Sequence, residues 1–167
     1  MSGAFGALRE RVAEQLRQNG LNALAAMDCA PASRWREAAA AVALSGVACA
    51  PGGFRDYLGV RSDPATGREQ ELYGRQAEIT LTLDIFAPRD GGGDACQRAA
   101  EIAVESLLCQ GAAGLTALEV RTGRVEFLEK EGLYRQSVSC RCGAWLISRT
   151  GEEAGTFVDF EVKGKIT

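Results

Sequence analysis

The segment RQAEITLTLDIFA, residues 75–87, decides the fold because its side chains alternate between apolar and polar. Its apolar members are Ala77, Ile79, Leu81, Leu83 and Ile85, and its polar members are Gln76, Glu78, Thr80, Thr82 and Asp84. Successive side chains of a β-strand point to opposite faces, so this period of two predicts one long strand with an apolar face and a polar face. The apolar face must then be covered by another layer of structure.

A second long strand is predicted over residues 133–148, where the same alternation returns. One of its faces comprises Val138, Cys140, Cys142, Ala144 and Leu146, and the other comprises Ser137, Ser139, Arg141 and Trp145. Residues 158–166 also alternate and predict a final strand. Residues 37–50 are rich in alanine, but their branched side chains and the following Pro51-Gly52-Gly53 favour a strand over a helix.

Two short strands are predicted at residues 118–120 and 125–128, with a turn at Thr122-Gly123 between them. A helix is predicted over residues 4–18, because Phe5, Leu8, Val12 and Leu16 recur every three or four positions. Asn19-Gly20 ends it, since glycine readily adopts the left-handed conformation that closes helices. Residues 21–27 are expected to add one or two helical turns.

A second helix is predicted over residues 95–109, with Ala99, Ile102, Ala103 and Leu107 available for burial. The element order then predicts one α+β domain spanning residues 1–167. It consists of a mostly antiparallel or mixed sheet with both helices packed on one face. A length of 167 residues, with 46% hydrophobic and 25% charged residues, is typical of a single globular domain.

Composition narrows the classes of function. A net charge of −3 and a pI near 5.2 disfavour wrapping around a nucleic-acid backbone, which requires a basic face. No apolar run approaches the roughly 20 residues of a membrane span, and the N-terminal segment lacks the apolar core of a signal peptide. We therefore expect a cytosolic protein with mostly reduced cysteines. The absence of histidine disfavours hydrolases and metalloenzymes, so no enzymatic activity is expected.

The glycines Gly91 to Gly93 lie between a strand and a helix, which is the order found in phosphate-binding loops. A P-loop needs Lys and Ser or Thr after its last glycine, whereas Asp94, Ala95 and Cys96 follow here. We expect a connector instead, with Asp94 and Gln97 forming a capping box at the helix start. Cys140 and Cys142 point the same way on a strand and are expected to be buried thiols, so no metal or cofactor is predicted.

Residues 51–74 contain several turn signals and no clear periodicity, which predicts a long loop. The loop also carries aromatic and apolar side chains, so we expect it to become ordered against a partner. Trp145 lies beside Arg141 on the polar face of its strand, and both residue types are enriched at protein interfaces. The candidate interface residues are Phe54, Tyr57, Leu58, Leu72, Tyr73, Arg89, Asp90, Arg141 and Trp145.

The element order and several short phrases carry a resemblance to a known family. The phrases are DYLG (56–59), LYGR (72–75), ITLTLDIFAPR (79–89) and FVDFEVKG (157–164). In its element order and in these phrases, the chain resembles the tail terminator, or tail completion, proteins of long-tailed bacteriophages and phage-tail-like contractile particles. The resemblance implies a hexameric ring that caps the head-proximal end of the tail tube, ends tube polymerisation and anchors the sheath.

The resemblance implies that the partners are further copies of the chain, the tail tube protein, the sheath protein and, in headed particles, the head connector. DNA would at most pass through the lumen, with no cofactor and no membrane involved. Such a protein occupies the cytoplasm of the producing bacterium during assembly and then the finished particle. Two alternatives remain open: another neck, sheath-end or baseplate component of the same particle, and a nucleotide-binding domain that uses residues 91–93.

Overall fold

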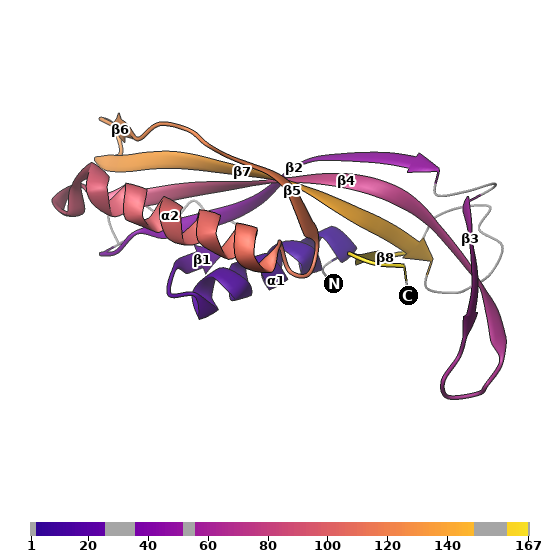
Figure 1. The fold of residues 1–167 in the computed structure, drawn as a ribbon. Helices are drawn as coiled ribbons and strands as arrows, with labels where there is room; N and C mark the ends of the chain where they lie inside the picture. The colour runs from indigo at the N-terminus through magenta and orange to yellow at the C-terminus, as the bar shows by residue number, and fades with distance from the viewer. Residues whose placement is uncertain (1–2, 26–35, 52–55, 149–159, 167) are drawn as a thin grey trace.

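The long strand predicted from the alternating segment is the centre of the molecule in a computed structural model that describes residues 3–25, 36–51, 56–148 and 160–166. It is β4 (Glu69–Pro88), and it pairs antiparallel with β7 (Leu133–Ser148) along almost its whole length, from Gly74 opposite Ile147 to Pro88 opposite Leu133. The bounds of β7 match the predicted strand. This pair is the frame on which the other elements are arranged (Figure 1).

The remaining elements add strands at both sides of the pair and helices on one face. In chain order they are α1 (Ala4–Gln18), β1 (Asn22–Leu24), β2 (Ala39–Pro51), β3 (Tyr57–Ser62), a 3-10 turn (Arg89–Gly91), α2 (Gly92–Gln110), β5 (Thr116–Thr122), β6 (Glu126–Leu128) and β8 (Phe160–Lys163). The sheet runs β1-β2-β4-β7-β5, with β3 paired to β4 and with β6 and β8 paired to β7. Only β1 and β2 are parallel among the described pairs. The predicted α+β class with a mixed sheet is confirmed.

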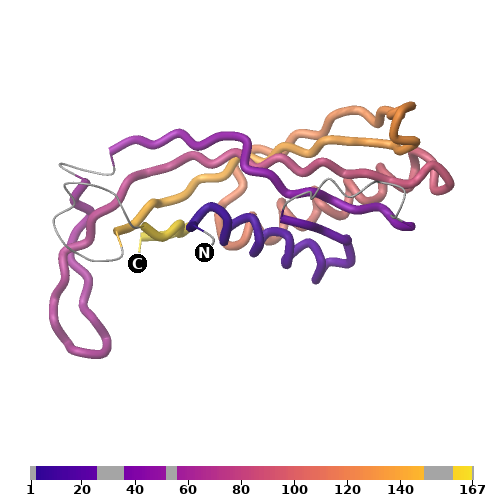
Figure 2. The backbone as a smooth tube through the Cα atoms, turned by 180° about the vertical axis from the view of Figure 1, so that it is seen from behind, coloured from indigo at the N-terminus to yellow at the C-terminus, as the bar shows by residue number. Residues whose placement is uncertain are grey.

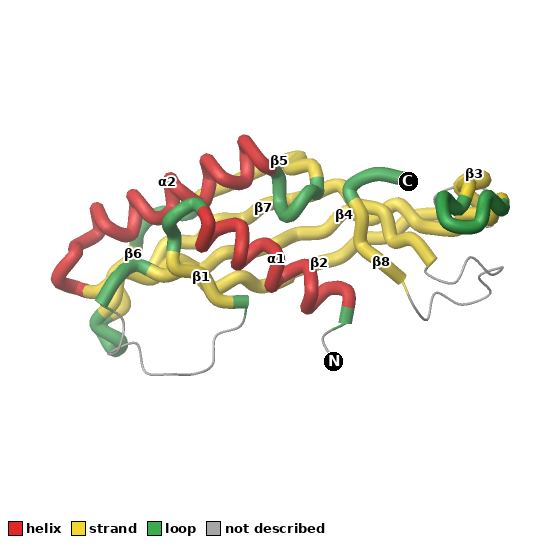
Figure 3. Tube along the Cα trace, turned by 90° about the horizontal axis from the view of Figure 1, so that it is seen from below, coloured by secondary structure: helices red, strands yellow, loops and turns green. Residues whose placement is uncertain are grey.

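Both helices cover the same face of the sheet, as the view from below shows (Figure 3). The core lies between them and the apolar faces of the central strands. Its fully buried members include Leu8, Val12 and Leu16 from α1, Ala103 and Leu107 from α2, Ile79, Leu81, Leu83 and Ile85 from β4, and Val138, Cys140 and Cys142 from β7. The two-residue period therefore correctly identified the face that the helices cover.

The predicted extension of the first helix over residues 21–27 is wrong. The helix ends at Gln18 as predicted, and Gly20 takes a φ of 87° to turn the chain. Asn22 to Leu24 then pair in parallel with residues 39–41 of β2, which makes them strand β1. Pairing with a distant strand overrides the local preference of so short a segment, and Met27 lies outside the described residues.

The predicted long loop at residues 51–74 is also largely wrong. Tyr57–Ser62 and the beginning of β4 form an antiparallel hairpin, and the Asp63 carboxylate organises its tip by accepting hydrogen bonds from Ala65 N (2.9 Å) and Thr66 Oγ1 (2.8 Å). These hydrogen bonds stabilise the ionised carboxylate and lower the pKa of Asp63. The bond from the Ala65 amide makes the largest contribution, and the bond from Thr66 follows. The hairpin extends beyond the helices (Figures 1 and 2), so burial by the core does not impose a two-residue pattern on it.

Two local predictions near α2 and β5 fail as well. The helix begins at Gly92, earlier than expected, and no side chain caps its N-terminus, so Asp94 and Gln97 form no capping box. The chain does not reverse at Thr122-Gly123, because β5 and β6 are both antiparallel to β7 and therefore run in the same direction. The Gly123 N–H donates to Ser137 O at 2.8 Å, which holds this stretch against β7. None of the helices in the described ranges is both long and apolar enough to cross a membrane.

Neighbouring residues on opposite faces of β4 provide a test of this core. Leu81 is fully buried, whereas Thr80 lies half-buried on the face without helices. Replacing Leu81 by Ala should lower the free energy of unfolding by about 2–5 kcal/mol, because it removes buried methyl groups and leaves a cavity. Replacing Thr80 by Ala should change it by less than about 1 kcal/mol. Urea unfolding followed by circular dichroism measures both, and equal losses would contradict the assigned burial.

Candidate assembly surfaces

The predicted interface residues do not form one site. Tyr57, Leu58, Leu72 and Tyr73 lie in the hairpin of residues 56–74, which we call the arm. Arg89 and Asp90 lie in the turn between β4 and α2, and Arg141 and Trp145 lie on the sheet face that points away from the helices, which we call the outer face. Phe54 lies outside the described residues.

The base of the arm is tightly joined to the sheet. Asp56 is buried, adopts an unusual φ of 62° for a non-glycine residue, and accepts hydrogen bonds from Arg75 Nε at 3.1 Å and NH2 at 3.0 Å. A Cβ at Gly74 would lie 2.6 Å from Leu58 Cδ1 and 2.8 Å from Leu146 O. Gly74 therefore allows Leu58 to pack across β4 at the point where its pairing with β7 begins, so Leu58 holds the arm in place.

The arm exposes only part of its predicted contact set. Leu72 and Tyr73 are buried, and the Tyr73 hydroxyl donates to Glu71 Oε2 at 2.6 Å. Tyr57 packs edge-on against the Tyr73 ring with centroids 5.7 Å apart, yet it remains 40% exposed, and Val60 is 55% exposed. Tyr57 and Val60 are thus exposed apolar side chains on an arm that projects beyond the body of the molecule (Figure 1).

A different surface lies at the other end of the sheet. The Arg89 guanidinium carbon stands 5.9 Å from the centroid of the Phe127 ring, and this ring packs against Tyr134 with centroids 4.9 Å apart. Phe127 is 40% exposed, and Asp90 is exposed beside Arg89. Figure 1 places β6, which carries Phe127, at the opposite end of the molecule from β3. The molecule therefore has two unlike surfaces at its two ends.

The glycine loop contributes to this second end. Gly92 has a φ of 69°, a conformation that glycine adopts easily. A Cβ at Gly93 would lie 3.5 Å from Val125 Cγ1 and 3.8 Å from the Tyr134 ring. The loop thus packs beside the Phe127 cluster.

Arg141 and Trp145 contact their own chain on the outer face. Arg141 makes ion pairs with Glu78 at 3.3 Å and with Glu119 at 3.7 Å, and Trp145 is half-buried, with Lys163 of β8 opposite it in register. Solvent-exposed ion pairs contribute about 0–1 kcal/mol each. Exchanging the ion pairs of Arg141 for contacts with a partner would therefore cost little free energy. The predicted interface role of Arg141 and Trp145 remains a prediction.

The two thiols of β7 are buried, as predicted. Cys140 Sγ and Cys142 Sγ lie 3.4 Å apart in the core. Their hydrogen bond, together with burial, raises the pKa of the Cys142 thiol, and burial also raises the pKa of Cys96. A raised pKa disfavours the reactive thiolate. Within the described residues, no group of three or more His, Cys, Asp or Glu side chains could hold a metal ion.

Among the described strands, the outer part of β2 lies at an edge of the sheet. Of the described strands, only β4 pairs with residues 43–51. These residues include no charged side chain, although charged residues commonly protect free edges from pairing with other chains. The edge can therefore accept a further strand. The sequence predicted this strand but gave no sign of which edge would be free.

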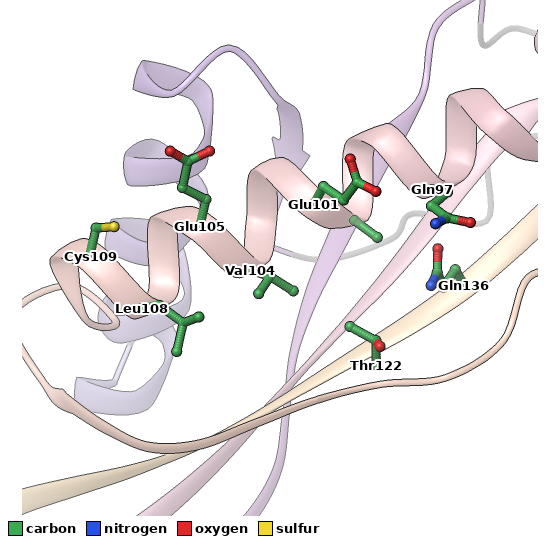
Figure 4. Close-up of a pocket in the computed structure, with 9 residues that line it drawn as sticks. Gln97, Glu101, Val104, Glu105, Leu108, Cys109, Thr122 and Gln136 are labelled. Atoms are coloured by element: carbon green, nitrogen blue, oxygen red, sulfur yellow. The ribbon is translucent and has the colours of Figure 1, made fainter.

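A shallow groove lies between α2 and the strands β5 and β7 (Figure 4), with a volume of about 420 Å³. Its lining residues are Gln97, Ala100, Glu101, Val104, Glu105, Leu108, Cys109, Thr122 and Gln136. Sequence reasoning missed this groove. Its one visible signal was Leu108, an apolar residue outside the predicted buried set of α2, which is 65% exposed.

Comparison of the sequence with protein-family models finds no matching family, and comparison with curated proteins finds no matching relative.

Cysteine reactivity tests the placement of the thiols. In a Cys29→Ser background, the exposed Cys49 and Cys109 should react with the thiol reagent DTNB in the native protein, whereas the buried Cys96, Cys140 and Cys142 should react only after unfolding. Absorbance of the released thiolate, followed with and without guanidinium chloride, measures both groups. Rapid native labelling of Cys140 or Cys142, identified by peptide mass spectrometry, would contradict the buried pair.

Proposed function

We propose that the protein is a structural assembly subunit that forms a ring on the head-proximal end of a tail tube, where it stops tube polymerisation and anchors the sheath or the head connector. The observation that carries this proposal is the arm. Its firm base and its exposed Tyr57 and Val60 suit a contact with another polypeptide. Aromatic side chains are frequent energetic centres of such contacts.

The two unlike ends support head-to-tail association. A ring requires heterologous contacts, in which one surface of a subunit meets a different surface of the next. The arm at one end and the Arg89–Phe127 cluster at the other end are two such surfaces. The free edge of β2 offers a third contact, through backbone pairing with a neighbouring strand. We infer a hexamer from the resemblance to tail terminators.

The charge of the chain is compatible with this role. A net charge of −3 gives a ring little attraction for DNA, so DNA could pass through its lumen without being held. The proposed partners are further copies of the chain, the tube protein, the sheath protein and, in headed particles, the head connector. The proposed location is the bacterial cytoplasm during assembly and the finished particle afterwards. This role requires neither a cofactor nor covalent chemistry.

Substitution of Tyr57 by Ala tests the arm. The change removes an exposed aromatic ring whose only described ring contact is Tyr73, so the fold should remain intact and its free energy of unfolding should fall by less than about 1.5 kcal/mol. Association should weaken by about tenfold or more, because loss of an aromatic interface centre costs about 2 kcal/mol. Mass photometry across a concentration series, with and without tube protein, measures the association.

Leu118→Ala supplies a matched control, because Leu118 is an exposed apolar residue outside the arm. The control should assemble and limit tube length like the unchanged protein. The proposal is wrong if the unchanged protein remains monomeric and leaves tube length unregulated in co-assembly. Loss of the cooperative unfolding transition in Tyr57→Ala would show instead that the arm packs on its own core.

A further inference from the structure

The groove beside α2 has an apolar floor and an acidic rim. Val104 and Leu108 point from the helix toward the strands, while Glu101 and Glu105 point outward along the same helix (Figure 4). Every charged residue that lines the groove is acidic. An exposed leucine at one end of the groove (Figure 4) favours an apolar occupant, and the rim favours one that carries positive charge.

A buried polar atom marks the other end of the groove. The Gln136 side chain donates from Nε2 to Gly123 O at 2.9 Å, which fixes the direction of its amide. Its Oε1 is buried beneath the exposed Gln97 side chain and accepts no hydrogen bond from the described residues. An unpaired buried carbonyl is destabilising, because it has lost its hydrogen bonds to water without gaining others. An occupant that displaces Gln97 and brings an N–H donor would remove this cost.

We propose that this groove binds Lys165 and Ile166 of a second copy of the chain, the two exposed residues that follow β8 and Gly164. Ile166 is 41% exposed and supplies the apolar side chain. Lys165 is exposed beside it and supplies both positive charge and N–H donors, and Lys163 adds a second positive charge that is partly offset by its ion pair with Glu161 at 3.5 Å. The segment is thus complementary to the groove in apolar character and in charge.

The arm fits the groove less well. It also places an apolar residue, Val60, beside a basic one, Arg61, but acidic side chains at Asp63, Glu69 and Glu71 accompany them. These carboxylates would face the carboxylates of the groove rim, and like charges in an interface oppose association. Among the described residues 160–166 the one acidic side chain is Glu161, and it is already paired with Lys163.

The occupant is assigned to another copy because the segment is anchored at Gly164 and the residues that follow run away from α2 (Figure 3). Gly164 packs directly against the Gly114 carbonyl, so closely that a Cβ at position 164 would overlap it. From there the C-terminal residues run away from α2 (Figure 3). Each copy therefore has a donor segment and an acceptor groove at different places, which gives a heterologous contact. This inference rests on the self-association proposed above and names one of its contacts.

Disulfide trapping tests the contact, because Cys109 is an exposed native thiol that lines the groove. The Ile166→Cys substitution is introduced in a Cys29→Ser background. The ¹⁵N-labelled and unlabelled forms of this protein are mixed in equal parts, and the mixture is oxidised with copper phenanthroline. Disulfides require Cα atoms within about 7 Å. Peptide mass spectrometry should find Cys109 joined to the introduced thiol at position 166 between labelled and unlabelled copies. The exposed Cys49 lies outside the groove and serves as the internal control, so its link to the introduced thiol should be rare.

Charge reversal provides a second measurement that does not depend on thiols. Lys165→Glu should weaken self-association by about fivefold, and Glu105→Lys in the same chain should restore it, because the exchanged charges again attract. Both residues are exposed, so neither change should alter the folded monomer by circular dichroism.

Three results would overturn the inference. The first is a disulfide between Cys109 and the introduced thiol that forms only within one copy. The second is trapping of Cys49 as often as Cys109. The third is a Lys165→Glu variant whose self-association is unchanged, or is not restored by Glu105→Lys. If copies associate but show any of these results, the groove assignment fails while the proposed ring stands. If the unchanged protein does not associate with itself under any condition tested, including addition of tube protein, both proposals fail together.

Discussion

The antiparallel pairing of β4 with β7 is the interaction on which the rest of the structure depends. It brings two long strands into register from Gly74 to Pro88 and places their apolar residues on a single face. Both helices pack on that face, and all other strands attach directly or indirectly to these two. Burial of such a continuous apolar surface is the main favourable contribution to folding, so the core needs no metal or disulfide among the described residues.

The same pair also determines where the candidate contact surfaces lie. Because β4 continues past the helices, its first residues and β3 form an arm without a helical layer beneath it. At the other end, β7 carries Tyr134 beside Phe127 of β6, next to the turn that starts α2. The long strands therefore separate two exposed aromatic surfaces to opposite ends of one subunit. This separation is what a head-to-tail contact needs.

Periodicity predicted the structure wherever one face of an element is buried and the other is not. The bounds of α1 and β7 and the buried face of β4 were correct for this reason. The arm lacks this contrast, so residues 57–62 and 69–74 looked like a loop. β1 depends on a pairing with residues 39–41, which local sequence does not encode.

The candidate contacts were only partly predictable. Tyr57 and Arg89 are exposed, whereas Leu72 and Tyr73 are buried. The aromatic and apolar composition of the arm indicated a contact segment. Composition alone does not distinguish the side chains that are buried within the arm from those that the arm exposes. The groove was missed because it joins Leu108 of α2 to Thr122 and Gln136 of two strands, and only the fold brings these residues together.

The position of the protein on an assembled particle tests the proposed role most directly. Gold-labelled protein can be located by electron microscopy on isolated tail tubes and sheathed particles. A ring that ends tube growth should appear at one end of each particle, at the end nearest the head where a head is present, and the tubes should have uniform length. Label along the tube, label at the baseplate end, or no bound label would contradict a terminator role.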